Sequence, residues 1–485
     1  MKELIFAIFK TGSGTFLTLI FGAITTKIIA YTAGASGLGL WSVVKEVQKS
    51  GLMMGSLNGN TSLVRGIGAL NGEAKHQFIR TVMLIFFIGG LVVTLTLIFF
   101  ATPISVLLKD IPAYIVMLMA IPVLFAIARS YVQGCLNGYR LIGRLAKTQI
   151  VGAAGGALIA YPVSVLAKNG SPSGLVLLSG VSAAVGLLAG LYYLKRINGF
   201  YLNLWKAPYW RLRAAKEFIL IAGILSITGV VSVLSALGVK AIILKNGGLV
   251  DAGLFEASWG LSVMYVSILL SSFGTYVLPK LSSLDESGQV TLIQRVTKLT
   301  IIISIPVIVI VICIKPLVIS IFFSQEFLPT IKMFRWMLIG DYFKISGWVF
   351  AMVLVANRYV GALVLSSVLW DLGLMLSVWL SYEFKLGLEL IGFAIMALHA
   401  LSLSFYYPYI RKKIGIKLSK RILITWFLGL IIIVFVSILT WEMIVVNWGH
   451  VCLLLLVSFG LVFFIIDGKD KLAIGFAYEN LKSKL

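Results

Sequence analysis

The stretch TKIIAYTAGASGLGLW (26–41) decides the fold of this chain, because a similar stretch, VKAIILKNGGLVDAGLF (239–255), follows in its second half. Both copies close with related segments, SLVRGIGALNGE and TYVLPKLSSLDE. The best matches keep a nearly constant register between the copies, and they pair Lys27 with Lys240, Gly39 with Gly253 and Glu73 with Glu286. A repeat of this length predicts two similar helical bundles.

The composition places both bundles in a membrane. Of the 485 residues, 60% are hydrophobic, and mean hydropathy is +1.02. A helix needs roughly 20 apolar residues to cross a bilayer and the connectors are short, so we expect an all-α polytopic membrane protein with about fourteen transmembrane helices. The N-terminal stretch MKELIFAIFKTG has no small-residue cleavage site and is interpreted as part of the first span. The expected spans are 5–33, 38–65, 79–101, 113–137, 147–167, 174–194, 217–244, 252–279, 291–314, 331–356, 359–382, 387–410, 421–441 and 447–466.

The repeat also predicts the domain organisation. We expect an N-lobe at 1–194, a cytoplasmic basic linker at 195–216, a C-lobe at 217–410, and two extra helices with a cytoplasmic tail at 411–485. Each lobe has six spans, so the second lobe has the same orientation in the membrane as the first. The two lobes are therefore related by an axis along the membrane normal. Two bundles that rock against each other around a midplane site are typical of alternating-access transporters. The alternative is a gene duplication in another class of membrane protein.

The net charge of +23 is mostly a signal of topology. Most of the 41 Lys and Arg residues fall in one alternating set of loops and in the two termini, with dense clusters at 195–216 and 411–421. This asymmetry predicts that both termini lie in the cytoplasm. Because the charge is distributed by topology, we expect no nucleic-acid partner, and membrane lipids are the surrounding partner.

A second group of cations lies inside the hydrophobic stretches, where a charge costs about 2.5–3.5 kcal/mol on insertion scales. Such residues normally face a bundle interior or a wet cavity. Acidic residues in the same stretches are fewer, so pairing cannot neutralise every cation. The surplus predicts a cavity that binds an anion. The candidate substrate-binding cations are Lys27, Lys45, Lys49, Arg129, Lys240 and Lys344, with Arg335 as a further internal cation, and the internal carboxylates are Glu46, Glu256, Asp341 and Asp371.

The second span carries the densest group of these charges. Lys45 and Lys49 are one helical turn apart and share a face, and Glu46 can pair with Lys49. Lys27 lies near the outer end of the first span and Lys45 near that of the second, so the two can converge at a similar depth. A diphosphate suits several ammonium donors in a medium of low dielectric. The alternative is that Lys27 and Lys45 extend to the periplasmic interface.

The tenth span places Asp341 and Lys344 three residues apart on one face, near the middle of the membrane. They form either a charge pair that closes on itself and fixes helix packing, or a pair that opens when substrate or a proton arrives. Buried carboxylates can carry protons in transporters, so all four internal carboxylates are candidate coupling groups for H⁺ or Na⁺. Arg129, midway along the fourth span, either faces the lumen or pairs with Asp371 or Asp341.

The motifs of most enzyme classes are missing from the sequence. There is no G-x-x-x-x-G-K-[ST], so we expect no nucleotide hydrolysis, and no G-x-S-x-G, C-x-x-C or H-E-x-x-H occurs. Cys135, Cys313 and Cys452 are scattered and odd in number, which favours small buried hydrophobic residues. We therefore expect no enzyme, no metal and no cofactor. A membrane glycosyltransferase, the contrasting class, usually needs carboxylate motifs on loops, which we do not find.

Three segments resemble Wzx-type polysaccharide repeat-unit flippases. They are GASGLGLW (34–41), AGLFEASWGLSVMYVSILLSSFGTYVLPKLSSL (252–284) and FFSQEFLPTIKMFRWMLIGDYFKISGWVFAMVLVANR (322–358). The resemblance runs through about residues 1–415, and it is closest to O-antigen translocases and to the lipid III flippase of enterobacterial common antigen. This family belongs to the MOP superfamily, which includes the MATE multidrug exporters and the lipid II flippases.

The resemblance implies two six-helix lobes in a V shape around a cationic lumen, in the bacterial inner membrane. It implies as substrate an oligosaccharide on undecaprenyl pyrophosphate, moved from the cytoplasmic to the periplasmic leaflet. Glycan polymerase and chain-length proteins are expected partners of a monomeric flippase. Asp341 and Lys344 fall on the family's "GD..K" element, whereas Arg335 departs from the family pattern. The alternatives are a MATE-type drug or cation exporter, which needs an acidic lumen, and a lipid II flippase, which also holds a pyrophosphate.

Overall fold

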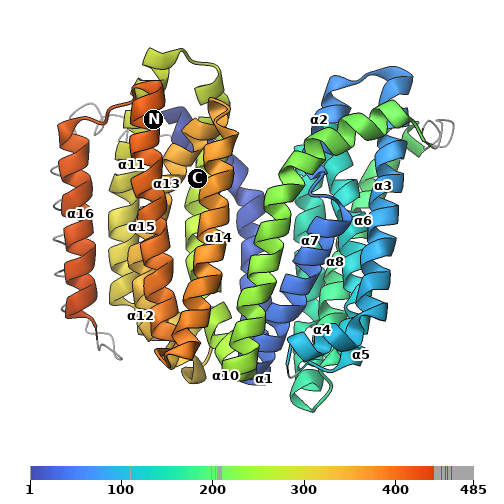
Figure 1. The fold of residues 1–485 in the computed structure, drawn as a ribbon, viewed down its shortest axis with the longest axis horizontal. Coiled ribbons are helices and arrows are strands. Elements are labelled where there is room, and N and C mark those ends of the chain that lie inside the picture. Colours follow the sequence, from blue (N-terminus) through green and yellow to red (C-terminus); the bar gives the residue numbers. More distant parts are fainter. Residues whose placement is uncertain are drawn as a thin grey trace, which may run out of the picture. The chain divides into compact units, whose positions relative to one another are not determined.

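The computed structural model describes residues 2–441, apart from 110, 198, 202–203 and 205–209, and the isolated positions 449, 454, 456 and 460. Within this part of the chain every regular element is a helix (Figure 1). The elements are α1 (Lys2–Gly55), α2 (Asn60–Ala69), α3 (Gly72–Phe99), α4 (Ala101–Leu107), α5 (Ala113–Leu118), α6 (Ala120–Gly138), α7 (Ile142–Lys168), α8 (Ser173–Lys195), α10 (Leu212–Ser282), α11 (Glu286–Cys313), α12 (Lys315–Phe322), η1 (Gln325–Thr330), α13 (Ile331–Ala356), α14 (Val360–Glu383), α15 (Gly387–Ile414) and α16 (Lys420–Leu439).

Eleven helical stretches of the described chain are long and apolar enough to cross a membrane. Two of the helices, α1 with 54 residues and α10 with 71, are too long for one crossing, which needs roughly 20 residues. Each consists of two helices that meet at a kink, at Gly34 in α1 and at Gly248 in α10. The all-α polytopic architecture is therefore confirmed. The count of fourteen stays a prediction, since the span expected at 447–466 lies almost wholly outside the described residues.

The predicted repeat is visible in the backbone. Gly34 has φ 67° and ψ −165°, and its counterpart in the second copy, Gly248, has φ 69° and ψ −167°. A positive φ with this ψ is accessible to glycine but strained for other residues, so both kinks need a glycine. The helices that follow the two copies, α3 and α11, are each 28 residues long. Their first residues, Gly72 and Glu286, keep the same register as the two kinks.

The chain forms two compact units. The N-unit is Leu17–Glu256, and the C-unit begins at Ala257 and includes the first turns of α1. The division falls inside α10, whereas the sequence predicts a linker at 195–216. The first part of α10 belongs to the N-unit because Phe218 packs beside Phe86 and accepts a hydrogen bond from the Ser62 hydroxyl through its carbonyl. The lobe boundaries expected from the repeat stay a prediction.

In the N-unit, α7 and α8 pack through small residues. A Cβ at Gly152 would lie 3.0 Å from the carbonyl oxygen of Ser182, and one at Gly156 would lie 3.2 Å from the Ser182 Cβ. The Ser182 hydroxyl also donates to the carbonyl of Gly152 at 3.0 Å. Small residues let helix backbones approach closely, and in a bilayer this contact replaces the hydrophobic driving force that water supplies to soluble bundles.

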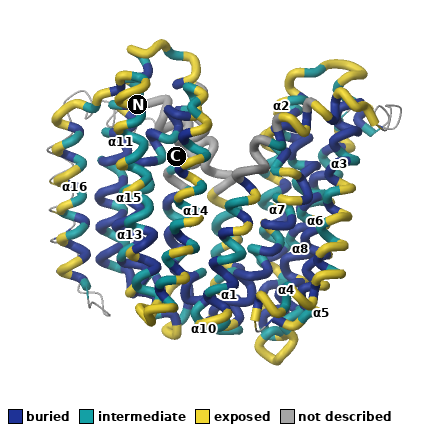
Figure 2. The backbone as a smooth tube through the Cα atoms, viewed as in Figure 1, coloured by how far each residue is buried: buried dark blue, intermediate teal, exposed yellow. Residues whose placement is uncertain are grey.

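The C-unit is built around α13, which is buried along most of its length (Figure 2). It packs against α11, α14, α15 and α16. Its approach to α15 is close at Gly392, where a Cβ would overlap the carbonyl oxygen of Met333. On the other side Trp426 of α16 stacks on Tyr342 and donates to the Ser346 hydroxyl at 2.9 Å. A helix so enclosed holds its polar residues inside the unit.

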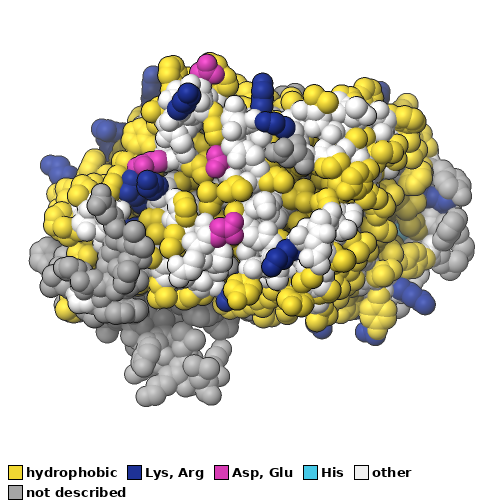
Figure 3. All heavy atoms as spheres, turned by 90° about the horizontal axis from the view of Figure 1, so that it is seen from below, with side chains coloured by type: hydrophobic (Ala, Val, Ile, Leu, Met, Phe, Trp, Pro, Cys, Tyr) yellow, Lys and Arg dark blue, Asp and Glu magenta, His cyan; other side chains and the backbone are white. Residues whose placement is uncertain are grey.

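The outer faces of the helices carry large apolar side chains. Ile431, Phe435 and Ile438 of α16 are each more than half exposed, as is Leu369 of α14. Seen from below, hydrophobic side chains cover much of the surface, and basic and acidic side chains are scattered over it (Figure 3). Contiguous exposed apolar surface of this extent marks a membrane protein whose outer face meets lipid.

Candidate functional site

Within the N-unit, the stretches that follow the two kinks cross at two glycines. A Cβ at Gly39 would overlap the carbonyl oxygen of Leu249, and one at Gly253 would overlap that of Ala35. Ala35 and Leu249 directly follow the two kink glycines, so each repeat makes the same contact with the other. No side chain fits at this crossing. It brings the turns after Gly39 and after Gly253, which carry the charged residues, close together.

The carboxylate of Glu256 lies between two lysines. Lys45 donates to its Oε1 at 2.8 Å and Lys240 to its Oε2 at 3.0 Å. The exposed fraction is 41% for the Lys45 side chain, 13% for Glu256 and 5% for Lys240. We call these three residues the lysine clamp. Lys45 is the partly exposed lysine of the clamp, and Lys240 is its buried lysine.

The buried lysine of the clamp has its donors well placed. Besides Glu256, the Lys240 Nζ donates to the Ser42 hydroxyl at 2.9 Å and lies 5.1 Å from the centre of the Phe255 ring. The Lys45 Nζ lies 5.9 Å from the centre of the Trp41 ring. Hydrogen bonds and aromatic faces offset part of the cost of removing an ammonium from water. With two cations and one carboxylate, the lysine clamp carries a net charge of +1.

Lys49 extends the positive charge along α1. It lies one turn beyond Lys45, its side chain is 69% exposed, and its Nζ is 3.6 Å from Glu46. The predicted pairing of Lys49 with Glu46 is thus present. An exposed i,i+3 pair of this kind contributes little to stability, about 0.2–0.5 kcal/mol, so Lys49 is free to exchange Glu46 for an incoming anion.

Lys27 lies apart from the clamp. Its side chain is exposed, and among the described residues it has no ion pair. The sequence match pairs Lys27 with Lys240, which are 213 residues apart. The kinks instead pair Gly34 with Gly248, which are 214 residues apart. Lys240 therefore corresponds in the fold to Thr26, and a shift of one residue turns a helical side chain by about 100°. This rotation explains why Lys240 points inward and Lys27 does not.

Arg129 of α6 is held by α7 and α8. Its Nη1 donates to the Ser182 carbonyl at 3.5 Å, and a Cβ at Gly186 would lie 3.0 Å from its Cδ. The guanidinium thus fills a space left by small residues on the neighbouring helices. The contacts of Arg129 with Gly152, Ser182 and Gly186 all lie within the N-unit, and its pairing with Asp371 or Asp341 stays a prediction.

In the C-unit, Asp341 is held by neutral donors. The Ser262 hydroxyl donates to its Oδ1 at 2.8 Å and the Tyr265 hydroxyl to its Oδ2 at 2.5 Å, and the residue is 2% exposed. Lys344 instead lies with its Nζ 5.8 Å from the centre of the Trp259 ring. The interpretation of Asp341 and Lys344 as a closed ion pair is therefore not realised in this structure.

Lys344 borders a row of aromatic side chains. Trp259 lies 6.1 Å from Trp370, and Trp370 lies 5.4 Å from His399, measured between ring centres. The indole Nε1 of Trp370 is buried without a hydrogen-bond partner among the described residues. Asp371, the next residue, makes an interaction of its own. The structure thus surrounds the carboxylate and the lysine of the "GD..K" element with different neighbours.

Arg335, which the sequence leaves unexplained, lies beside the end of α16 and contacts residues of two other segments. Its guanidinium pairs with Glu389 of α15, lies 3.4 Å from the centre of the Trp441 ring and donates to the Trp441 carbonyl at 3.3 Å. Nearby, Lys315 donates to the carbonyl oxygen of Thr440 and, at 3.0 Å, to its hydroxyl oxygen. Two cations therefore fasten the end of α16 to α12, α13 and α15.

Sequence reasoning missed the neutral partners of these sites. Ser42 precedes Lys45 by three residues, and Ser262 and Tyr265 are three apart, so each set shares a helix face. That spacing was the available signal. Hydroxyls at such spacing are common in membrane helices, and their partners on other helices cannot be read from sequence.

Comparison with known proteins places the chain in a family. A family model described as polysaccharide biosynthesis protein matches residues 69–332, more than half of the chain. The chain belongs to this polysaccharide biosynthesis protein family. The Lipid III flippase of Escherichia coli (strain K12) is 25% identical over 372 residues, which cover 74% of this chain and 86% of the relative. The Lipid III flippase of Shigella flexneri matches to the same extent.

Solved structures support the same fold for this family member. The lipid II flippase MurJ in an inward closed conformation has a TM-score of 0.71 at 15% identity, covering 94% of this chain and 97% of that one. A multidrug resistance MATE transporter of the MOP superfamily, in an inward-facing conformation, has a TM-score of 0.69 at 12% identity, covering 84% and 98%. This member of the polysaccharide biosynthesis protein family is therefore a multi-pass membrane protein with the MATE-like fold.

Proposed function

We propose that this protein is a flippase for a lipid-linked glycan. It moves an oligosaccharide repeat unit on undecaprenyl pyrophosphate from the cytoplasmic to the periplasmic leaflet by alternating access. The observation that carries the proposal is the lysine clamp, where Lys45 and Lys240 share the single carboxylate of Glu256. An internal site with net positive charge suits a diphosphate, and the relatives matched by sequence are named as flippases of a lipid.

The charge of the clamp favours this function over export of organic cations. A MATE-type exporter of cationic drugs needs unpaired carboxylates in its cavity. In the N-unit, Glu256 has two lysine partners and Glu46 has one, so neither carboxylate is available to a cation. A lipid II flippase also holds a diphosphate, so it differs from our proposal in the glycan and not in the chemistry of the clamp.

We also propose that transport is coupled to H⁺ or Na⁺ through Asp341. This carboxylate is buried and accepts from two hydroxyls, so it has no cation within ion-pair distance among the described residues. Protonation or an incoming Na⁺ would neutralise it in place. Both termini are proposed to lie in the cytoplasm. The monomer and its association with glycan polymerase and chain-length proteins are proposed from the family resemblance.

The function is tested by deleting the gene in its own host and complementing with variants. The deletion should remove the surface glycan and leave lipid-linked repeat units in the cytoplasmic leaflet. Lys240→Gln should restore little export at unchanged membrane abundance, whereas Leu234→Gln, an exposed position six residues before Lys240 on the same helix, should restore it. Intact surface glycan in the deletion strain, together with new sensitivity to cationic drugs, would favour the exporter instead.

A further inference from the structure

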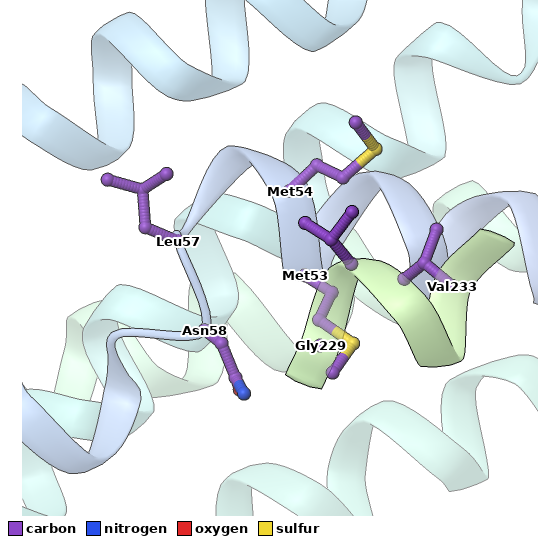
Figure 4. A pocket seen from close by; sticks show the side chains of 7 residues that line it. Met53, Met54, Leu57, Asn58, Gly229 and Val233 are labelled. Atoms are coloured by element: carbon purple, nitrogen blue, oxygen red, sulfur yellow. The ribbon is translucent and has the colours of Figure 1, made fainter. Parts of the chain in front are cut away.

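The N-unit contains a small apolar pocket where the end of α1 faces α10. Met53, Met54, Leu57 and Asn58 line it from the α1 side, and Gly229, Val230 and Val233 line it from α10 (Figure 4). Its volume is about 140 Å³. The Met53 methyl would lie 2.9 Å from a Cβ placed at Gly229, so the missing side chain leaves the space that Met53 partly enters. Met54, Leu57 and Val230 are exposed at the mouth.

The pocket and the lysine clamp lie between the same two helices. Ser42 of α1 opposes Lys240 of α10, and Met53 opposes Gly229. The two contacts are eleven residues apart on each helix. Going from the first contact to the second, residue numbers rise along α1, from 42 to 53, and fall along α10, from 240 to 229. The helices therefore run antiparallel in register for about three turns. We call the interface of these two helices, from the clamp to the pocket, the slot.

The residues that face this slot change from charged to apolar along it. On α1, Lys45, Lys49 and Met53 follow at intervals of four and share one helix face. On α10, Val233 lies two turns before Lys240, which is again the same face. Lys49 and Met53 are separated by about 6 Å along the helix axis. A ligand for the whole slot needs an anionic head directly joined to a narrow apolar chain.

We propose that the slot holds the first isoprenoid unit of the carrier lipid in the apolar pocket, with the diphosphate on the lysine clamp and Lys49. The inference rests on the proposed function, because it assigns the two parts of that substrate to two ends of one site. Methionines line the pocket, and their flexible thioethers adapt to a branched chain. With both termini in the cytoplasm, as proposed above, the clamp lies toward the periplasm, so the slot holds the carrier in the orientation of the periplasmic leaflet.

The test compares two probes on purified protein in lipid nanodiscs. Inorganic pyrophosphate reports the cationic end alone, and geranyl diphosphate adds two isoprenoid units. Empty nanodiscs measure partition of geranyl diphosphate into lipid, which is subtracted. We expect the wild-type protein to bind geranyl diphosphate about tenfold more tightly than inorganic pyrophosphate, a difference of about 1.4 kcal/mol.

The variants separate the two ends of the slot. Val233→Phe fills the pocket and should bind both probes with equal affinity. Its matched control is Leu234→Phe, because Leu234 is the neighbouring residue, is 61% exposed and does not line the pocket. This control should behave as wild type. Lys240→Gln should weaken both probes together. If Val233→Phe does not fold, Gly229→Leu is the alternative pocket-filling variant, because the nearest atom to a Cβ at Gly229 is the flexible end of Met53, at 2.9 Å.

Each outcome has one meaning. If the pocket-filling variants keep the tenfold preference for geranyl diphosphate, the isoprenoid site is wrong, while the anion site stands. If Lys240→Gln weakens inorganic pyrophosphate but leaves the affinity for geranyl diphosphate unchanged, the pocket is an unrelated lipid site and the inference fails. If inorganic pyrophosphate does not bind the wild-type protein at all, the proposed diphosphate site fails with it.

Discussion

Gly39 and Gly253 make the same backbone contact from opposite sides of one crossing. Each lies so close to a carbonyl of the other repeat that a Cβ would overlap the oxygen. Two glycines at equivalent positions of the repeat thus form a pseudo-symmetric joint. Because Lys45 and Glu256 follow within two turns of this joint, the geometry of the lysine clamp depends on it.

Substitution at this joint should disturb the clamp. Gly39→Ala or Gly253→Ala places a methyl group against backbone, which cannot move aside as a side chain does, and overpacking costs at least about 1–3 kcal/mol. We expect a lower unfolding temperature and weaker pyrophosphate binding in both variants. Gly22→Ala is the control, because a Cβ at Gly22 has no atom within 4 Å. Wild-type binding in both joint variants would contradict this account of the crossing.

Removing the shared carboxylate should have opposite effects on stability and on anion binding. Glu256→Gln leaves Lys45 and Lys240 unpaired, and we expect it to lower the free energy of unfolding by about 1–3 kcal/mol, less than for a fully buried pair because Lys45 is partly exposed. The same change removes a competing anion, so inorganic pyrophosphate should bind more tightly. Thermal unfolding and titration calorimetry measure the two effects.

A second substitution checks the electrostatic origin of the stability loss. In Glu256→Gln with Lys240→Met, the buried charge is absent, so stability should return toward that of wild type while tight binding is lost. If the double variant is as unstable as the sum of the single changes, the carboxylate acts through packing and not through its charge.

Much of the fold follows from the sequence because its signals are local. Apolar length predicts the helices, and the repeated stretch at 26–41 predicts two related bundles. The kinks were harder to foresee, since a glycine inside an apolar run has several meanings. The one-residue error that matched Lys27 with Lys240 shows the limit of weak sequence similarity. The two positive-φ glycines at the kinks, Gly34 and Gly248, fix the register, and the Gly39–Gly253 crossing keeps it.

The candidate site was predictable only as a list of charges. Internal cations indicate an anion site, but partners come from helices far apart in the sequence, as for Lys45 and Glu256, which are 211 residues apart. Spacing within one helix predicted the pair of Glu46 and Lys49, which the structure contains. The same rule suggested an ion pair of Asp341 with Lys344, where hydroxyls from α10 bind the carboxylate instead.

The carboxylate of Asp341 is expected to couple transport to an ion gradient. Asp341→Asn keeps the hydrogen-bonding shape but removes the charge that a proton or Na⁺ would neutralise. In proteoliposomes we expect wild-type flipping of lipid-linked sugar to accelerate several-fold with an imposed pH or sodium gradient. The variant should flip at one rate with and without the gradient.

Ser262→Ala is the companion variant for this test. It removes one hydrogen-bond donor to Asp341 and keeps the carboxylate, so flipping should still accelerate with the gradient. The pH or Na⁺ concentration at which the rate is half-maximal should shift. Gradient-independent flipping by the wild-type protein would leave downhill transport driven by consumption of the product. A gradient response that survives in Asp341→Asn would move the coupling group to another carboxylate.

The last prediction concerns Lys315, which lies between the spans of α11 and α13. Burial, together with the nearby positive charge of Arg335, lowers the pKa of Lys315 from its usual 10.5 to about 8. Between these values the unfolded chain binds more protons than the folded one, so stability rises with pH across this window by up to about 1.4 kcal/mol per pH unit. Unfolding temperatures of wild type and Lys315→Met should therefore be compared from about pH 7.5 to 9.5. The wild type should gain stability relative to the variant as pH rises, whereas Lys332→Met, at an exposed position of α13, should follow the wild type. Parallel curves for wild type and Lys315→Met would mean that Lys315 stays charged beside Thr440 throughout.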